Sequence, residues 1–134
     1  TIIVYAMTDE LNNSTMIFLY FAIAAMTIAF DTLYGLCDID DDKKFGINST
    51  PIWWGSNTLK IVACFQSMAI FLLLIVGWQA ALKFIWFLGV FCLIGFYVYQ
   101  HHLANQKKYF LAFKNNHWAS FYLLMLSVLC FLII

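Results

Sequence analysis

Long runs of apolar residues are the feature that most constrains how this chain can fold. A helix needs about 20 consecutive apolar residues to cross the hydrocarbon core of a membrane. Hydrophobic residues make up 64% of the chain and charged residues only 10%, too little polar surface for a water-soluble domain of this size. We therefore predict an all-α, polytopic transmembrane helix bundle of about four spans. The runs are Ser14 to Leu36, Leu59 to Trp78, Leu82 to Tyr99 and Trp118 to Ile134.

The connections between these runs predict how the spans are arranged. Only residues 79–81 separate the second run from the third, and so short a link forces an antiparallel hairpin. The other two connections, residues 37–58 and 100–117, are longer and polar, so both must lie on the same side of the membrane. Six of the seven basic residues lie in or beside these two connections, which favours the cytoplasm for both.

Charge and cysteine usage exclude several functions. The formal net charge is zero, so nothing indicates capture of nucleic acid, and the absence of Arg excludes bidentate Arg clamps on phosphate. The histidines lack a third metal ligand at a standard spacing. The cysteines lie far apart without a Cys-x-x-Cys pair, so we interpret them as apolar packing residues. They are Cys37, Cys64, Cys92 and Cys130.

One segment, residues 31–50, holds most of the acidic residues. If a single helix continues through it, Asp31, Asp38 and Asp42 fall within roughly 20° of one line, because a helix turns about 100° per residue. Asp31 follows an apolar run near the hydrocarbon boundary, where an unpaired carboxylate costs on the order of 2.5–3.5 kcal/mol toward the span centre. Mg²⁺ is held by one or two carboxylates together with substrate phosphates. We therefore expect these three side chains to share a helix face and to bind Mg²⁺ with a diphosphate.

A plainer alternative is that residues 38–44 form a solvated turn at a helix end. Two features favour the binding interpretation. Asp31 lies in apolar surroundings, and Gly46 followed by Ser49 and Thr50 predicts a helix stop and a new cap before the next span. An EF-hand calcium loop is excluded because Lys43 stands where that loop needs Gly.

Two stretches resemble a known family. The run DTLYGLCDIDDDKKFGINST, residues 31–50, resembles the second aspartate motif of UbiA-type intramembrane prenyltransferases. Its pattern is closest to that of bacterial 4-hydroxybenzoate polyprenyltransferases, D-T-x-Y-A-M-x-D-R-x-D-D-x-K-I-G-x-K-S-T. The run YVYQHHLANQKKYFLAFKNN, residues 97–116, is similar to the penultimate cytoplasmic loop of the family. The likeness covers nearly the whole chain.

The resemblance implies a bundle of about nine transmembrane helices in the inner membrane, with two aspartate motifs facing each other across a central cavity. Residues 1–134 would be the C-terminal part of this single domain, with the second motif in the cytoplasmic loop 37–58 and a second cytoplasmic loop at 100–117. The first motif, of the form N-D-x-x-D, has no counterpart in the sequence. We therefore expect the missing N-terminal half as a partner and no activity from this chain alone.

The resemblance also implies a reaction. Mg²⁺ would bind a polyprenyl diphosphate and stabilise the departing pyrophosphate, and the resulting allylic cation would attack 4-hydroxybenzoate ortho to its hydroxyl, in ubiquinone biosynthesis. Membrane lipid would surround the helices. The catalytic residues and Mg²⁺ ligands implied are Asp31, Asp38 and Asp42, and the substrate-binding residues are Tyr34, Asp41 and Lys44. Aromatic faces available to the cation belong to Phe18, Phe21, Phe30 and Tyr34.

Three departures from the family pattern weaken the detail that the resemblance implies. Ile39 stands where Arg is usual, Asn48 where Lys is usual and Gly35 where Ala is common. Less positive charge is then available for the diphosphate or the acceptor carboxylate.

Two alternatives stay open. One is another acceptor on the same scaffold, such as a naphthoate, homogentisate or haem precursor, and the other is a small non-catalytic membrane subunit. We expect packing roles for Tyr5, Gln66 and Gln100, and contact with anionic lipid headgroups for Lys107, Lys108 and Lys114.

Overall fold

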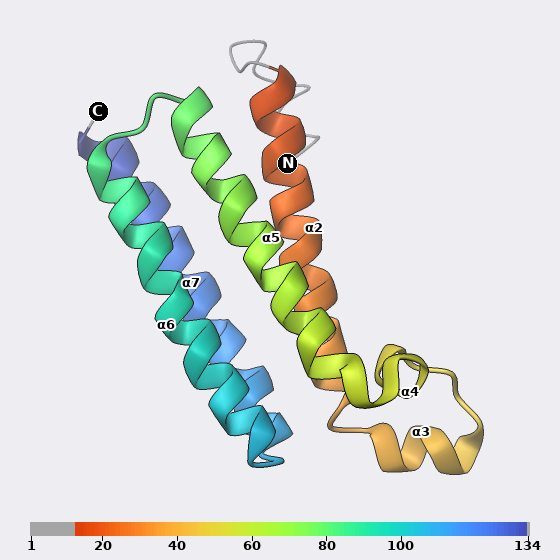
Figure 1. Ribbon diagram of the computed structural model, residues 1–134. Helices are drawn as coiled ribbons and strands as arrows, with labels where there is room; N and C mark the ends of the chain where they lie inside the picture. Colours follow the sequence, from red (N-terminus) through yellow and green to blue (C-terminus); the bar gives the residue numbers. More distant parts are fainter. Residues whose placement is uncertain (1–12, 134) are drawn as a thin grey trace.

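The computed structural model describes residues 13–133, and within that range every regular element is a helix. Four long helices run side by side (Figure 1): α2 (Asn13–Gly35), α5 (Thr58–Gln79), α6 (Phe84–Asn105) and α7 (Tyr109–Ile133). Three short elements occupy the connection between α2 and α5: α3 (Ile39–Phe45), α4 (Thr50–Trp54) and the 3₁₀-helix η1 (Gly55–Asn57). The predicted all-α bundle is confirmed.

Three segments of the described chain are long and apolar enough to cross a membrane: Ser14–Gly35, Thr50–Gln79 and Phe84–Asn105. They confirm the first three expected spans. The fourth, expected at 118–134, falls on α7, and its last residue lies outside the described range. Its role as a span stays a prediction.

The ends of the helices confirm the predicted topology and show that one connection is mostly helical. Helices α5 and α6 form the expected hairpin, and the α2–α5 and α6–α7 connections lie together at the opposite end of the bundle (Figure 1). Helices α6 and α7 leave only residues 106–108 between them, so most of the stretch 100–117 is helical, and its place outside the membrane stays a prediction. Polar side chains in this stretch find partners inside the bundle. Gln100 Nε2 donates to Ala112 O at 2.9 Å, and Asn115 Nδ2 donates to Phe96 O at 2.9 Å.

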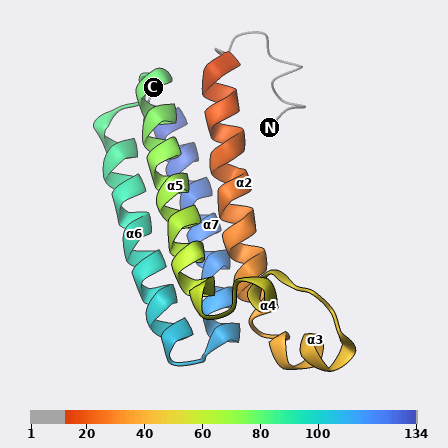
Figure 2. The same cartoon turned by 45° about the vertical axis from the view of Figure 1, so that its right-hand side comes forward.

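Small and apolar residues at spacings of three and four bring the helices together. Helix α2 packs mainly on α5, and α7 mainly on α6. Figure 2 shows α7 behind α5. On α2, Ala22, Ala25 and Ala29 are at most 2% exposed and let the α5 backbone approach closely. The outward faces are apolar as well, as for Phe71 and Leu132, which suits contact with lipid.

A buried polar network joins three helices near the α6–α7 turn. Gln66 of α5 donates to Gln100 of α6, which donates in turn to the backbone of Ala112 in the first turn of α7. His101 Nε2 also lies 2.9 Å from Gln66 Oε1. The packing roles expected of Gln66 and Gln100 are confirmed, whereas Tyr5 lies outside the described residues. The network fixes the start of α7 beside the end of α6 and the first half of α5.

Candidate functional site

Asp31 lies on the last turns of α2, on the side turned away from α5. The next two residues, Thr32 and Leu33, are each 1% exposed, so they face the interior while Asp31 is exposed. The Thr32 hydroxyl is satisfied locally, because it donates to Ile28 O at 2.7 Å. The Asp31 carboxylate is therefore open to a ligand.

The expectation of one helix through the acidic segment is wrong. Helix α2 ends at Gly35, a turn follows, and Asp38 begins the separate helix α3 with φ −103° and ψ 6°. Figure 1 shows α3 running across the end of α2. The physical reason is charge, because a continuous helix would place the acidic run at the negative C-terminal end of α2. The break instead places three acids in the first turn of α3, where the helix dipole stabilises them.

Glycine at position 35 also allows the chain to fold back. A Cβ at this residue would lie 3.0 Å from Cγ of Pro51, so α4 packs closely against the end of α2. The predicted stop and cap are found, since Gly46 ends α3 with φ 68° and Ser49 stands at the N-cap position of α4. The Ser49 hydroxyl nevertheless makes no capping hydrogen bond.

Part of the predicted carboxylate row survives on α3. The Asp42 N–H donates to Asp38 O at 2.9 Å, so these two residues are one helical turn apart. Asp41 and Lys44, the predicted substrate-binding residues of this helix, form an exposed ion pair of 2.8 Å. An exposed pair of this kind contributes less than about 1 kcal/mol, so either side chain can leave it for a ligand.

Within residues 13–133, no three His, Cys, Asp or Glu side chains are close enough together to hold a metal ion. Asp31 on α2 therefore stands apart from the Asp38 and Asp42 pair on α3. The carboxylates still fit Mg²⁺ chemically, because Mg²⁺ takes one or two carboxylates and completes its shell with water and phosphate oxygens.

Aromatic side chains link the Asp31 region of α2 to α7. The ring of Phe113 lies 4.8 Å from the ring of Phe30 and 5.1 Å from that of Tyr34. Phe30 and Tyr34 flank Asp31 along α2, so this side of the helix faces the start of α7. Tyr34, a predicted substrate-binding residue, remains 50% exposed.

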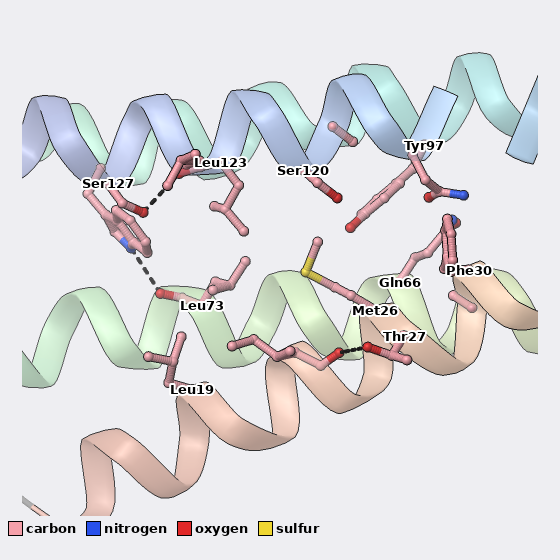
Figure 3. A pocket seen from close by; sticks show the side chains of 16 residues that line it. Leu19, Met26, Thr27, Phe30, Gln66, Leu73, Tyr97, Ser120, Leu123 and Ser127 are labelled. Carbon is pink, nitrogen blue, oxygen red and sulfur yellow. Dashed lines mark hydrogen bonds between the residues drawn. The ribbon is translucent and has the colours of Figure 1, made fainter. Parts of the chain in front are cut away.

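A cavity of about 490 Å³ is lined by all four long helices, with most of its lining residues on α2 and α7. Figure 3 shows Met26 and Leu73 pointing into it, with Phe30, Gln66 and Tyr97 at one end. Its other end reaches Trp86, beside the α5–α6 hairpin. The cavity is mostly apolar, and its polar end includes Phe30, which precedes Asp31 in the sequence.

Sequence reasoning gave no role to two residues of this site, Phe113 and Asn116. Both lie in the stretch 97–116 that resembles the family. The resemblance singled out this stretch but did not show which side chains these two residues contact. Asn116 lines the polar end of the cavity, and its Nδ2 donates to Phe113 O at 3.2 Å. Their function depends on contacts with α2, which are remote in sequence.

Comparison with known proteins agrees with the resemblance. A 4-hydroxybenzoate octaprenyltransferase from Marinobacter nauticus is 40% identical over 119 residues, which cover 87% of this chain and 40% of the relative. Enzymes of the same name from Shewanella woodyi and Alcanivorax borkumensis are 40% and 36% identical over 69% and 75% of this chain. The chain thus spans about 40% or less of the length of these relatives. No solved structure matches.

The family assignment follows from the match to the family as a whole. A sequence model of the UbiA prenyltransferase family matches residues 1–124. Together with the three apolar helices, this match identifies a multi-pass membrane protein. The chain belongs to the UbiA prenyltransferase family.

Proposed function

We propose that this chain supplies one aspartate site of a Mg²⁺-dependent prenyltransferase of the inner membrane. The complete enzyme transfers an isoprenyl chain from polyprenyl diphosphate to 4-hydroxybenzoate in ubiquinone biosynthesis. The observation that supports this most strongly is the position of Asp31, one residue from Phe30 at the polar end of the apolar cavity. The relatives are named 4-hydroxybenzoate octaprenyltransferases, which supports 4-hydroxybenzoate over the other acceptors.

The apolar cavity suits the isoprenyl chain. Its lining contains no charged side chain among the described residues. Each buried CH₂ group stabilises binding by about 0.8 kcal/mol, so a chain lying from Trp86 toward Phe30 is held along its length. The diphosphate end then lies at the end of the bundle where α3 and Asp31 are found.

Asp31, Asp38 and Asp42 would hold Mg²⁺, which supplies positive charge that stabilises the departing pyrophosphate. Because these carboxylates form no three-ligand group by themselves, we expect the metal to need diphosphate oxygens and a second aspartate motif. That N-D-x-x-D motif would come from an N-terminal half. Lys44 and Asp41 would exchange their mutual ion pair for contacts with the diphosphate, and Tyr34 would border it.

A chimera tests the proposal. Residues 1–134 replace the aligned segment of the Marinobacter nauticus relative, and transfer of a labelled prenyl group to 4-hydroxybenzoate is measured with and without Mg²⁺. The chimera should be active only with Mg²⁺, and Asp38→Asn should reduce turnover about 100-fold or more, because a charge that binds the metal is lost. Asp40→Asn, in the same helix at a variable position of the family pattern, should stay within about twofold of the parent.

Two results would refute this assignment. One is turnover by the 134-residue chain on its own. The other is full activity of the Asp38→Asn chimera, because the α3 carboxylates would then have no part in the reaction.

A further inference from the structure

A second cavity, of about 510 Å³, adjoins the apolar one between α2 and α7. It shares Phe30, Asn116 and Ser120 with the apolar cavity, so the two meet at these side chains. The chemistry of the two differs, because a lysine and a histidine line the second cavity and neither residue type lines the first. Its lining residues are Phe30, Phe113, Lys114, Asn116, His117 and Ser120.

Lys114 is available to an anionic ligand. Within residues 13–133, no carboxylate lies within ion-pair distance of Lys114, whereas Lys44 is paired with Asp41. His117 lies three residues further along α7 and so projects from the same side of the helix. Both side chains are exposed, and a lysine ammonium offers three donors to a carboxylate.

The residues of the acidic segment indicate why an acceptor would need a cation from this cavity. Ile39 and Asn48 are uncharged at the two positions where the family pattern has Arg and Lys. An aromatic acid entering beside Asp31 still needs a cation for its carboxylate, because carboxylates close together repel one another. Lys114 and His117 are the groups that the second cavity presents.

We propose that Lys114 and His117 bind the carboxylate of an aromatic acid acceptor whose ring lies against Phe30 and Phe113. This rests on the proposed function and names the acceptor site within it. It replaces the expectation of lipid contact for Lys114, while Lys107 and Lys108 keep theirs.

Asn116 fixes which way the acceptor points. Its Nδ2 donates to Phe113 O, and its Oδ1 accepts no hydrogen bond from the described residues. A phenolic hydroxyl opposite the carboxylate would donate to this oxygen, at the junction of the two cavities. The ring carbon beside that hydroxyl then faces the apolar cavity, where the isoprenyl chain lies.

Binding of labelled 4-hydroxybenzoate to the 134-residue chain in phosphatidylcholine nanodiscs tests the proposal without turnover. Lys114→Gln should weaken binding about tenfold or more, as expected for loss of a charge-assisted contact. Lys114→Arg should keep most of the affinity, and Lys108→Gln, a lysine of the α6–α7 turn outside the cavity, should bind as the parent does. Methyl 4-hydroxybenzoate, which has no charge, should bind weakly and equally to all four proteins.

Several outcomes would overturn the acceptor site. They are equal affinity of Lys114→Gln and Lys108→Gln, equal affinity of the parent for the acid and its methyl ester, and no saturable binding at all. Competition by pyrophosphate as strong as by unlabelled 4-hydroxybenzoate would instead indicate a diphosphate site. Loss of binding on adding phosphatidylglycerol would indicate a lipid-headgroup site.

The chimera separates failure of this inference from failure of the proposed function. If the chimera transfers prenyl groups and Lys114→Gln leaves the KM for 4-hydroxybenzoate unchanged, the acceptor site is wrong and the proposed function stands. If the parent chimera transfers no prenyl group, the proposed function fails, whatever the nanodisc measurement gives. The expected result is a KM for 4-hydroxybenzoate raised about tenfold, with the KM for the prenyl diphosphate unchanged.

Discussion

The pKa of the Cys37 thiol depends on the charge at Asp38. Cys37 lies in the turn between α2 and α3, and its Sγ donates to Leu33 O at 3.6 Å. Burial raises the pKa of the Cys37 thiol, and the neighbouring Asp38 carboxylate raises it further. The reactive thiolate is therefore a minor species at neutral pH.

Asp38→Asn should shift the pH profile of Cys37 alkylation to lower pH. The substitution removes the carboxylate but leaves the burial, so the pKa of Cys37 falls part of the way toward its ordinary value and thiolate forms at lower pH. The measurement is the rate of iodoacetamide alkylation against pH, in a chain whose other three cysteines are replaced by Ala. Asp40→Asn serves as control, and identical profiles for the two variants would contradict the effect of the Asp38 charge on the pKa of Cys37.

Residue identities in the site were largely predictable, whereas their partners were not. Asp31, Asp38 and Asp42 follow from residue type and family resemblance. Phe113 contacts Phe30, and Asn116 lines a cavity with Phe30, which lies on a different helix far away in the sequence. Spacing along a chain holds no information about such contacts.

Among the helices, the break after α2 shows why spacing alone misled. The separations of seven and four residues between Asp31, Asp38 and Asp42 suit one helical face only if the helix is continuous. A run of acids is unfavourable at a helix C-terminus and favourable at an N-terminus, so the chain starts the new helix α3. Gly35 lowers the cost of stopping there.

The α5–α6 hairpin depends on a glycine. A Cβ at Gly77 would overlap the indole of Trp86, which is 5% exposed and donates from Nε1 to Leu73 O at 3.0 Å. Because the indole is held by this hydrogen bond and by burial, it has little room to move. Gly77→Ala should therefore lower the free energy of unfolding by about 1–3 kcal/mol, measured by SDS titration in mixed micelles.

Gly95→Ala is the matched control for this substitution. No atom lies within 4 Å of a Cβ built at Gly95 on α6. This variant should equal the parent or gain about 0.5–1 kcal/mol from the better helix propensity of Ala. Equal stabilities of the Gly77 and Gly95 variants would contradict the close packing of α5 on α6.

At the scale of the whole molecule, the sequence predicts spans and connections better than helix neighbours. Span lengths and the short α5–α6 link are local properties, so the hairpin and the shared end of the other two connections were predicted correctly. The helices are apolar on nearly all sides, so no amphipathic period indicates which face meets which neighbour. The cavity between α2 and α7 could for this reason not be predicted.

The bundle separates the proposed metal ligands into two groups. Asp31 belongs to α2 and is exposed, whereas Asp38 and Asp42 lie at the start of α3, at the end of the bundle. We therefore expect a metal–diphosphate complex, rather than the protein alone, to bring the two groups to a common ligand.

Mn²⁺ binding, followed by electron paramagnetic resonance in the chimera with and without pyrophosphate, tests this expectation most directly. The predicted result is Mn²⁺ binding that depends on pyrophosphate and is weakened about tenfold or more by Asp31→Asn and by Asp38→Asn, but not by Asp40→Asn. Equally tight binding without pyrophosphate, or unchanged binding in either the Asp31 or the Asp38 variant, would contradict it.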